Sequence, residues 1–313
     1  MSATRHALVP PHERPVSRVA ICTVESYQAD LEAILWKLLA EFDLDVREKS
    51  VLLKPNLVER DVTGAINTHP AVVNAARECF LRMGAREVLI GDGPGHDRDT
   101  EAVVEAAGLC QYISNLRDIF VDLNLDDATC LSLRTHASSL KKLFLPNTVL
   151  RSDFVVSMPK MKTHHWSGVT LSMKNMFGIV PGGCYGWPKN ILHWAGIDKS
   201  ILDINATVRP NFAIVDGIVG MEGNGPIQGS PKNSKVLVLG DDPVAVDASC
   251  ARIMGIVPER VGYLEKAGWL LGHLQTDRIK QIGESIESVR IPFDVLLEFR
   301  GLLETSGSGD RIA

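Results

Sequence analysis

The sequence predicts an α/β protein of two lobes, with largely parallel or mixed sheets, helices on the sheet faces and an active-site cleft between the lobes. Short apolar runs of strand length alternate along the chain with stretches that have helical stripes of apolar residues, and this alternation is typical of α/β folds. Several apolar runs are followed by loops with polar side chains, and in open α/β sheets ligands bind beside the carboxyl ends of the strands. The length of 313 residues allows two domains or one large one.

The first part of the chain gives the clearest alternation of strands and helices. In order, we expect a strand at 19–24, a helix at 31–42, a strand at 51–53, a helix from 69 to about 83 and a strand at 87–90. The first helix is indicated by apolar residues three and four positions apart. The second helix begins with Pro70, which suits the first turn of a helix, and it is closed by Gly84.

The second part of the chain follows the same pattern after a weaker stretch. Two short apolar runs in that stretch, at 131–134 and 142–145, suggest a hairpin. Beyond it we expect strands at 154–156, 212–215 and 235–240, a helix at 201–208 and a helix from 243 to 254. Asp242 is the expected N-cap of the last helix, with Pro243 in its first turn. Asp247, one turn further on, could favour the helix dipole or point into a site.

We expect the chain to divide into four segments. These are a flexible N-terminal arm at 1–18, a first α/β lobe with extra strands at 19–150, a second α/β lobe at 151–302 and a flexible tail at 303–313. The arm is polar, with three prolines and no apolar core segment, so it does not resemble a signal peptide. The tail is rich in Gly and Ser, a composition that is typical of disordered chain ends.

Composition and charge exclude several classes of protein. The net charge of −5 leaves no general surface for nucleic acid, and no apolar run approaches the ~20 residues of a membrane-spanning helix. The six cysteines are scattered without C-x-x-C spacing, so motifs for an iron–sulfur cluster or a zinc ribbon are absent. We therefore expect a cytoplasmic protein that binds neither nucleic acid nor membrane, and the oligomeric state stays open.

The most informative stretch of the sequence lies between Phe154 and Trp194. After the apolar run at its start, it contains Lys160, Lys162, His164, His165, Lys174 and His193. Methionine, tryptophan and phenylalanine residues lie between these basic side chains, which favours the wall of a partly enclosed pocket over a solvent-exposed surface. The alternative is a solvated basic loop.

The chemistry of these side chains suits an anionic small molecule. Lys160, Lys162 and Lys174 could clamp an anion and stabilise developing negative charge, and histidines titrate near neutral pH. Further substrate-binding candidates are Lys54, Asn56, Asn175 and Asn224. Glu222 and Asp216 are candidates for a base or a metal ligand, although Asp216 could equally belong to a turn at a strand end.

Six stretches of the sequence match the pattern of one family. They are Val51–Val58, Thr68–Pro70, Gly91–Gly95, Met158–Gly178, Asp216–Gly229 and Asp242–Gly255. Together they resemble the domain of unknown function family number 362, from about residue 19 to about residue 272. That family name implies no reaction. Many members have an added ferredoxin segment, which this sequence does not contain, so the resemblance does not imply an iron–sulfur cluster here.

A more distant resemblance is to the nickel-pincer lactate racemases. Thr68-His69-Pro70 is similar to a Thr-His-Arg-Pro segment of that family, and His164 lies ten residues before Lys174, as a His and a Lys do there. Pro181-Gly182 and His193 follow after a three-residue insertion. The resemblance implies that His69 and His164 act as catalytic acid and base. It also implies that Lys174 anchors a cofactor and that His193 ligates a metal.

The candidate residues are far apart in the sequence. Each of them follows, or lies near, the end of a predicted strand or the start of a predicted helix. We therefore expect Lys54, His69, His164, Lys174 and His193 to converge on one cleft.

Three functions stay open from the sequence. The first is an enzyme, similar to racemases and epimerases, that acts on an anionic carboxylate or carbonyl metabolite by acid–base or hydride chemistry. The second is a metal-dependent or iron–sulfur-associated redox accessory protein, with His164, His165, His193 and Cys184 as metal ligands. The third is a non-catalytic binder of an anionic metabolite. The cofactor is also open, since a divalent metal or a nickel-type cofactor could serve the first two functions.

Overall fold

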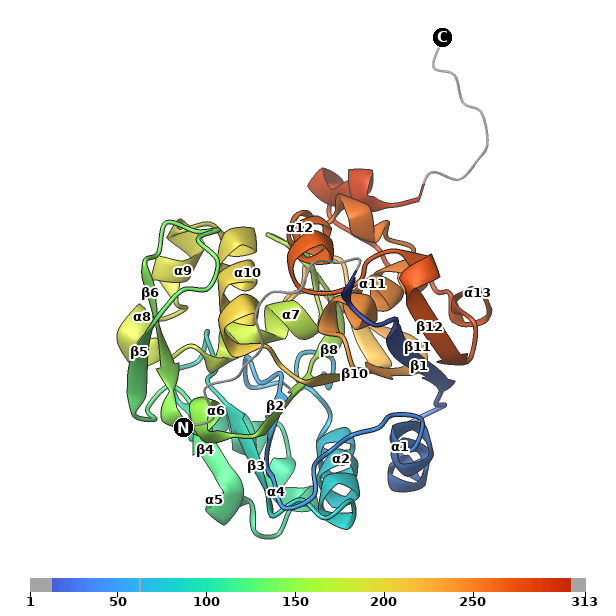
Figure 1. The fold of residues 1–313 in the computed structure, drawn as a ribbon. Helices are drawn as coiled ribbons and strands as arrows, with labels where there is room; N and C mark the ends of the chain where they lie inside the picture. Colours follow the sequence, from blue (N-terminus) through green and yellow to red (C-terminus); the bar gives the residue numbers. More distant parts are fainter. Residues whose placement is uncertain (1–12, 62, 305–313) are drawn as a thin grey trace.

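The computed structural model describes residues 13–61 and 63–304, and these contain a mixed ten-stranded sheet with helices on both faces (Figure 1). The strands of the sheet are β1 (Ser17–Thr23), β2 (Ser50–Pro55), β3 (Glu87–Asp92), β4 (Phe120–Asp122), β7 (Phe154–Met158), β8 (Lys160–His164), β9 (Gly168–Thr170), β10 (Phe212–Glu222), β11 (Ser230–Gly240) and β12 (Ile279–Gly283). They run in the order β12-β1-β11-β10-β7-β2-β3-β4, and β8 and β9 continue the sheet beside β10. The predicted α/β class is confirmed.

Parallel pairing dominates one half of the sheet and antiparallel pairing the other. The strands β4, β3, β2, β7 and β10 pair in parallel with one another in this order, whereas β11 pairs antiparallel with both β10 and β1. Because β7 lies between β2 and β10, the sheet continues across the expected boundary at residue 150, which falls within α6 (Asn147–Arg151). Residues 17 and 18, expected in the N-terminal arm, form the start of β1. The arm before residue 13 and the tail beyond residue 304 lie outside the described residues.

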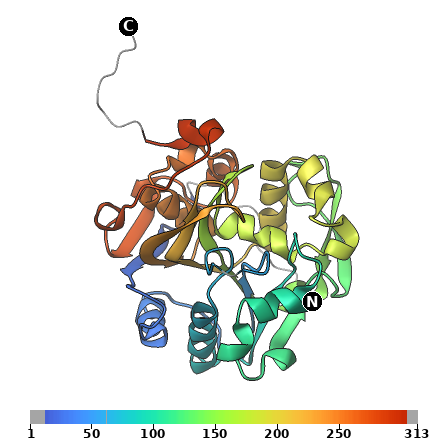
Figure 2. The same ribbon diagram turned by 180° about the vertical axis from the view of Figure 1, so that it is seen from behind.

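Helices cover both faces of the sheet (Figures 1 and 2). Besides α6, the α-helices are α1 (Leu31–Leu39), α2 (Pro70–Arg82), α3 (Thr100–Ala106), α4 (Leu109–Tyr112), α5 (Leu116–Ile119), α7 (Ser172–Asn175), α8 (Gly182–Tyr185), α9 (Asn190–Trp194), α10 (Ile197–Val208), α11 (Pro243–Ile253), α12 (Gly262–Leu270) and α13 (Ile286–Val289). The 3₁₀ turns are η2 (Met176–Ile179), η3 (Pro258–Arg260), η4 (Thr276–Arg278) and η5 (Leu297–Leu302). None of the helices in this part of the chain has the length and apolar content of a membrane span.

The sheet separates two apolar cores. The helices α1 and α2 pack on one face, and α10 and α11 pack on the other. Successive strand residues enter alternate cores, since Leu52 faces the α10–α11 side whereas Val51 and Leu53 face the α1–α2 side. A strand that is buried on both faces needs a continuous apolar run, which is why these strands can be recognised in the sequence.

Side-chain caps start two long helices where the sequence predicts them. His69 is the N-cap of α2, and its Nδ1 accepts a hydrogen bond from Ala71 N at 3.2 Å. Asp242 caps α11 by accepting from Val244 N at 2.9 Å. Each acceptor satisfies a free N–H of the first turn. The expected start of each helix is confirmed, and the side chain of His69 has a structural role.

A hairpin forms in the weaker stretch as predicted, although its first strand lies at 128–132 and not at 131–134. The ends of the two longest strands of the main sheet are not recognised in the sequence. The hairpin consists of β5 (Ala128–Ser132) and β6 (Lys142–Pro146), which form a separate two-stranded sheet. Apolar runs predict short strands at 212–215 and 235–240, but β10 and β11 each extend over 11 residues. The parts of these strands that were not predicted, at 216–222 and 230–234, contain Gly, Pro, Lys and Asn, which have low strand propensity. Pairing between β10 and β11 therefore determines that these residues form strands.

A fully buried ion pair fixes β8 against β10. Lys160 Nζ lies 2.8 Å from Asp216 Oδ2, and neither side chain is exposed to solvent. Tyr27 OH accepts a hydrogen bond from Lys160 Nζ at 2.9 Å and donates one to Asp216 Oδ1 at 3.0 Å. His69 N donates to Asp216 Oδ2 at 2.9 Å. Both charges are thus hydrogen-bonded, as a stable buried pair requires, and the network connects β8, β10, α2 and the loop at Tyr27.

We predict that Lys160→Met destabilises the fold by about 3–5 kcal/mol, because the Asp216 carboxylate would stay buried without its partner. Urea unfolding followed by circular dichroism measures this loss. The double variant Lys160→Met/Asp216→Leu should recover part of it, since both charges are then removed.

The control for this experiment is Lys49→Met, which breaks the surface pair with Asp45 at 2.6 Å. That change should cost less than about 1 kcal/mol, because exposed ion pairs contribute little. Equal losses in Lys160→Met and Lys49→Met would show that the buried pair does not hold the fold together.

Candidate functional site

A cavity of about 750 Å³ lies at the carboxyl ends of β2 and β3, beside β8 and α7. Its volume is within the range of small-molecule sites, roughly 300–1,000 Å³. The predicted site residues that line it are Lys54, Asn56, His164, Lys174, Asn175, His193 and Asn224. Asp92, Thr170 and Lys189 also line it without a predicted role, and so does His165, which was considered only as a metal ligand. The fold therefore brings together residues that are far apart in the sequence.

Five predicted site residues do not line the cavity: His69, Lys160, Lys162, Asp216 and Glu222. Lys160 and Asp216 bind each other in the buried ion pair, so neither is available to a substrate or a metal. His69 caps α2 and stacks on Tyr27, with 3.7 Å between the ring centroids. The expectation that His69 shares a cleft with His164 is not met, because its ring packs against Tyr27 and Tyr112 and does not line the cavity.

Lys162 and Glu222 are also used within the protein. Lys162 is fully buried, and its Nζ donates to Ile66 O at 2.8 Å. Burial lowers the pKa of Lys162 well below its usual value. Glu222 Oε2 accepts from Asp294 N at 3.0 Å and lies 2.9 Å from Lys232 Nζ of the neighbouring strand β11. A substrate ligand or base must reach the reacting molecule, and these two side chains are turned to other partners.

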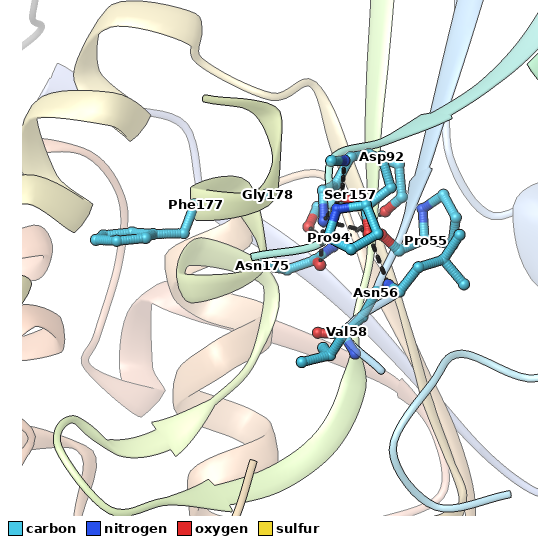
Figure 3. A network of polar contacts seen from close by, with 12 residues as sticks. Pro55, Asn56, Val58, Asp92, Pro94, Ser157, Asn175, Phe177 and Gly178 are labelled. Atoms are coloured by element: carbon cyan, nitrogen blue, oxygen red, sulfur yellow. Dashed lines mark hydrogen bonds and ion pairs between the residues drawn. The ribbon is translucent and has the colours of Figure 1, made fainter. Parts of the chain in front are cut away.

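The floor of the cavity is a buried network around Lys54 and Asp92. Lys54 Nζ lies 2.7 Å from Asp92 Oδ1 and donates to Asn175 Oδ1 at 2.7 Å. Asn175 Nδ2 donates to Lys54 O and to Ser157 Oγ, both at 3.0 Å, and Figure 3 shows Asn175 and Ser157 close to Asp92. Gly178 is needed beside them, because a Cβ there would collide with Lys54 Nζ and Asp92 Oδ1. Burial lowers the pKa of Lys54, and Asp92 counteracts this shift. Lys54 thus has an internal counter-ion.

Lys189 ties two backbone segments, at Gly93 and at residues 177–178, to the same floor. Its Nζ donates to the carbonyl oxygens of Gly93 at 2.8 Å, Gly178 at 3.0 Å and Phe177 at 3.3 Å. Burial lowers the pKa of Lys189 to about 7, and the charge of Asp92 counteracts this shift. Sequence reasoning missed Lys189, because a lysine outside any periodic pattern gives no signal of burial.

The short helix α7 brings Lys174 to the cavity and is held by Asp247 of α11. Asp247 Oδ1 accepts from Ser172 N at 2.7 Å, and Oδ2 accepts from Met173 N at 3.0 Å. Ser172 Oγ also donates to Asp247. Burial raises the pKa of Asp247 to about 7. Asp247 does not line the cavity, so it supports α7 from behind and does not enter the site.

Lys174 has no hydrogen bond and no carboxylate partner within the described part of the chain. Its Nζ lies 4.3 Å from the centroid of the Phe177 ring, a cation–π contact. Burial, and then the positive charge of Lys54, lower the pKa of Lys174 to about 7. An anion beside Nζ would reverse this shift, because an opposite charge favours the protonated form. Lys174 is therefore suited to bind a negatively charged ligand.

Backbone contacts fix the proton position of His164. Its Nδ1 accepts hydrogen bonds from Trp166 N at 2.9 Å and from Ser167 N at 3.2 Å. The neutral ring therefore has its proton on Nε2. Burial lowers the pKa of His164 well below its usual value, and the charge of Lys174 adds to the shift. At neutral pH the ring is uncharged and offers an N–H to the cavity.

His165 and His193 have the opposite proton arrangement. His165 Nδ1 lies 2.8 Å from Gly225 O, and His193 Nδ1 lies 3.2 Å from Lys189 O. Because a carbonyl oxygen only accepts, both rings have their proton on Nδ1 and a lone pair on Nε2. Trp166 lies between them, with its ring centroid 4.9 Å from each imidazole. Burial lowers the pKa of His193 to about 4.

The predicted metal site does not form from the predicted ligands. His193 lines the cavity, but Asp216 is bound to Lys160 away from it. In residues 13–61 and 63–304, no three His, Cys, Asp or Glu side chains come together as ligands for a metal ion. Cys184 is exposed and does not line the cavity, and His164 offers an N–H in place of a lone pair. The described residues therefore offer no cluster of protein ligands for a divalent metal ion, and no chemical step below depends on a metal.

Comparisons with known proteins place the sequence in a family and give distant structural relatives. The family described as "Domain of unknown function (DUF362)" matches residues 51–252. A thylakoid-associated protein of Synechocystis sp. is 29% identical over 220 residues, which cover 67% of this chain and 64% of that protein. This chain therefore spans less than two thirds of the length of that relative.

Two solved structures are similar at a low level. The lactate racemase apoprotein from Thermoanaerobacterium thermosaccharolyticum has a TM-score of 0.40 at 16% identity, over 69% of this chain and 53% of that one. A protein from Thermotoga maritima has a TM-score of 0.36 at 13% identity, over 64% of this chain and 52% of that one. Both TM-scores lie below 0.5, so the chemistry of this chain is argued from its own residues.

We predict that Lys174→Met stabilises the fold most below pH 7. The unfolded chain has the ordinary lysine pKa of 10.5 and the folded protein a pKa of about 7, so the unfolded chain binds more protons between these values. The wild type therefore gains stability as the pH rises through this window, and the advantage of the variant shrinks. Urea unfolding at about pH 6 and about pH 9 measures the difference. An advantage of the same size at both pH values would contradict the shifted pKa.

Proposed function

The chain belongs to the family described as a domain of unknown function, DUF362, and because that description names no reaction, we propose its function from the cavity. We propose that the cavity binds a small anionic metabolite with a carboxylate or carbonyl group. We further propose that the protein is an enzyme that moves a proton at the carbon beside that group, as racemases and epimerases do. This chemistry needs a cation, a hydrogen-bond donor and a base in one partly enclosed site.

The position of Lys174 is the main support for an anionic ligand. The Lys174 ammonium is partly withdrawn from water and has no carboxylate partner in the described part of the chain, which costs free energy, and a bound anion would remove that cost. Thr170 also lines the cavity, and its buried Oγ1 has no hydrogen-bond partner among the described residues. Lys54 and Lys189 already have partners in the protein, so Lys174 is the better anchor.

The charges around the cavity favour loss of a proton from a carbon next to a bound carboxylate. Removal of that proton moves negative charge onto the carboxylate oxygens. The ammonium of Lys174 and the N–H of His164 can stabilise this charge, because they are already in place before the reaction. A neutral imidazole in the same cavity can take the proton.

Non-catalytic binding of the same anion is the second candidate function. The unpartnered Lys174 and the unpaired hydroxyl of Thr170 would serve a binding protein equally well. A redox accessory protein is not supported as a third function, because the described residues contain no cluster of metal ligands. The cytoplasmic location also stays part of the proposal, supported by the six free cysteines, which suit a reducing compartment.

We predict that Lys174→Met weakens the binding of small carboxylates by about 10- to 100-fold, because a hydrogen bond to a charged group contributes about 1.5–3 kcal/mol. Isothermal titration with oxalate, malonate and malate measures the dissociation constants. The control is Lys199→Met, on the exposed side of α10, which should bind as the wild type does. Unchanged binding in Lys174→Met, or no binding of any probe to the wild type, would overturn the anion site.

We predict that the wild-type protein exchanges hydrogen for deuterium at the carbon beside the carboxylate of a chiral 2-hydroxy or 2-amino acid. The exchange is followed in D₂O as loss of the proton NMR signal of that carbon, across a panel of such acids. Lys174→Met should remove the exchange, since the carbanion loses its nearest cation. An acid that binds without exchange would favour the non-catalytic binder.

A further inference from the structure

We infer that His165 is the residue that takes the proton in this cavity, and that its neighbour His164 is a fixed hydrogen-bond donor. The assignment rests on the proposed function and identifies the base that this function needs. It differs from the expectation from the sequence, in which His164 acts as acid or base.

His164 cannot take a proton on the side that faces a ligand. Trp166 N and Ser167 N both donate to its Nδ1, so Nε2 already has the proton of the neutral ring. A second proton would have to enter at Nδ1, where it would displace two backbone hydrogen bonds. Ser167 N would then lose its partner in a buried position. His164 can therefore donate to a ligand oxygen but is not suited to act as a base.

His165 has the arrangement that a base needs. Its Nδ1 proton is held by Gly225 O at 2.8 Å, which leaves the lone pair of Nε2 without a partner among the described residues. When Nε2 takes a proton, the contact with Gly225 O is kept and becomes a charge-assisted hydrogen bond. Protonation of His165 thus strengthens an existing contact, whereas protonation of His164 would break two.

The two imidazoles act side by side. Their ring centroids are 4.9 Å apart and the ring planes are inclined by 20°, and both rings line the cavity. One ring therefore offers a hydrogen-bond donor and the other an acceptor to the same ligand. His193 also has a lone pair on Nε2, but burial, and then the charge of Lys174, lower the pKa of His193 to about 4 and oppose its protonation.

The proton transfer balances without a further reactant. The C–H bond beside the carboxylate breaks, and an N–H bond forms at His165 Nε2. The electron pair of the C–H bond moves onto the carboxylate oxygens, where Lys174 and His164 Nε2–H stabilise it. The imidazolium of His165 exchanges its proton with solvent and returns a proton or a deuteron to the same carbon.

Nitrogen NMR of the ¹⁵N-histidine-labelled protein tests the proton positions without a ligand. At about pH 8 ordinary imidazoles are neutral, and the two ring nitrogens differ in shift according to which one has the proton. We expect the Nε2–H form for His164 and the Nδ1–H form for His165, with signals assigned from the variants His164→Gln and His165→Gln. An Nε2–H form at His165 would overturn the inference.

Glutamine variants test the roles in the exchange reaction. The amide of a glutamine can donate a hydrogen bond near the position of Nε2 but cannot take a proton. His165→Gln should therefore lower deuterium exchange by about 10²- to 10⁴-fold, the usual contribution of a general base. His164→Gln should keep exchange within about tenfold of the wild type, because it keeps a donor. The control is His136→Gln, an exposed histidine outside the cavity, which should exchange as the wild type does.

The outcomes separate this inference from the proposed function. If the wild type shows no exchange with any acid of the panel, the proposed enzyme activity fails, and the inference fails with it. If the wild type exchanges but His165→Gln keeps its activity while His164→Gln loses it, the proposed function stands and the assignment of the base is wrong. Retained binding of malate in both glutamine variants would show that the losses arise from the reaction and not from misfolding.

Discussion

The buried ion pair between Lys54 and Asp92 is the interaction on which the cavity depends. It joins the end of β2 to the end of β3, and Asn175 brings α7 to the same ammonium group. Lys189 then binds three carbonyl oxygens of the adjoining segments. Loss of one member would leave its partners unpaired in a medium of low polarity, which is costly. The walls of the cavity therefore share one polar network, and their positions are coupled.

This network leaves the cavity with an excess of positive charge. Lys54, Lys174 and Lys189 all line the cavity, and burial lowers the pKa of each of them. Among the described residues, a carboxylate lies within ion-pair distance of Lys54 alone in this group. Such an arrangement reduces stability, and perturbed groups of this kind gather at functional sites. We interpret the excess charge as the complement of a ligand, which would supply the missing negative charge.

The sheet could be predicted better than the site, and β8 shows why. Strands such as β2 and β7 are buried on both faces, so their apolar runs are visible in the sequence. On β8, Lys160, Lys162 and His164 alternate with the strand period and share one side-chain direction, yet their fates differ. Lys160 lies opposite Asp216 of β10 and forms an ion pair with it, so it is not available to a ligand. His164, at the end of the strand, lines the cavity. The difference depends on the register of β8 against β10, which local sequence patterns do not specify.

The partly protonated state of Lys174 affects how any ligand of this protein would be measured. Burial holds its pKa at about 7, so about half of the empty molecules lack this proton at neutral pH. An anion that restores the usual pKa draws a proton from the buffer as it binds. The observed heat would then include the ionisation of the buffer, and the apparent binding enthalpy would vary from one buffer to another while the stoichiometry stayed constant. Calorimetry in a single buffer would therefore misstate the enthalpy of the contact itself.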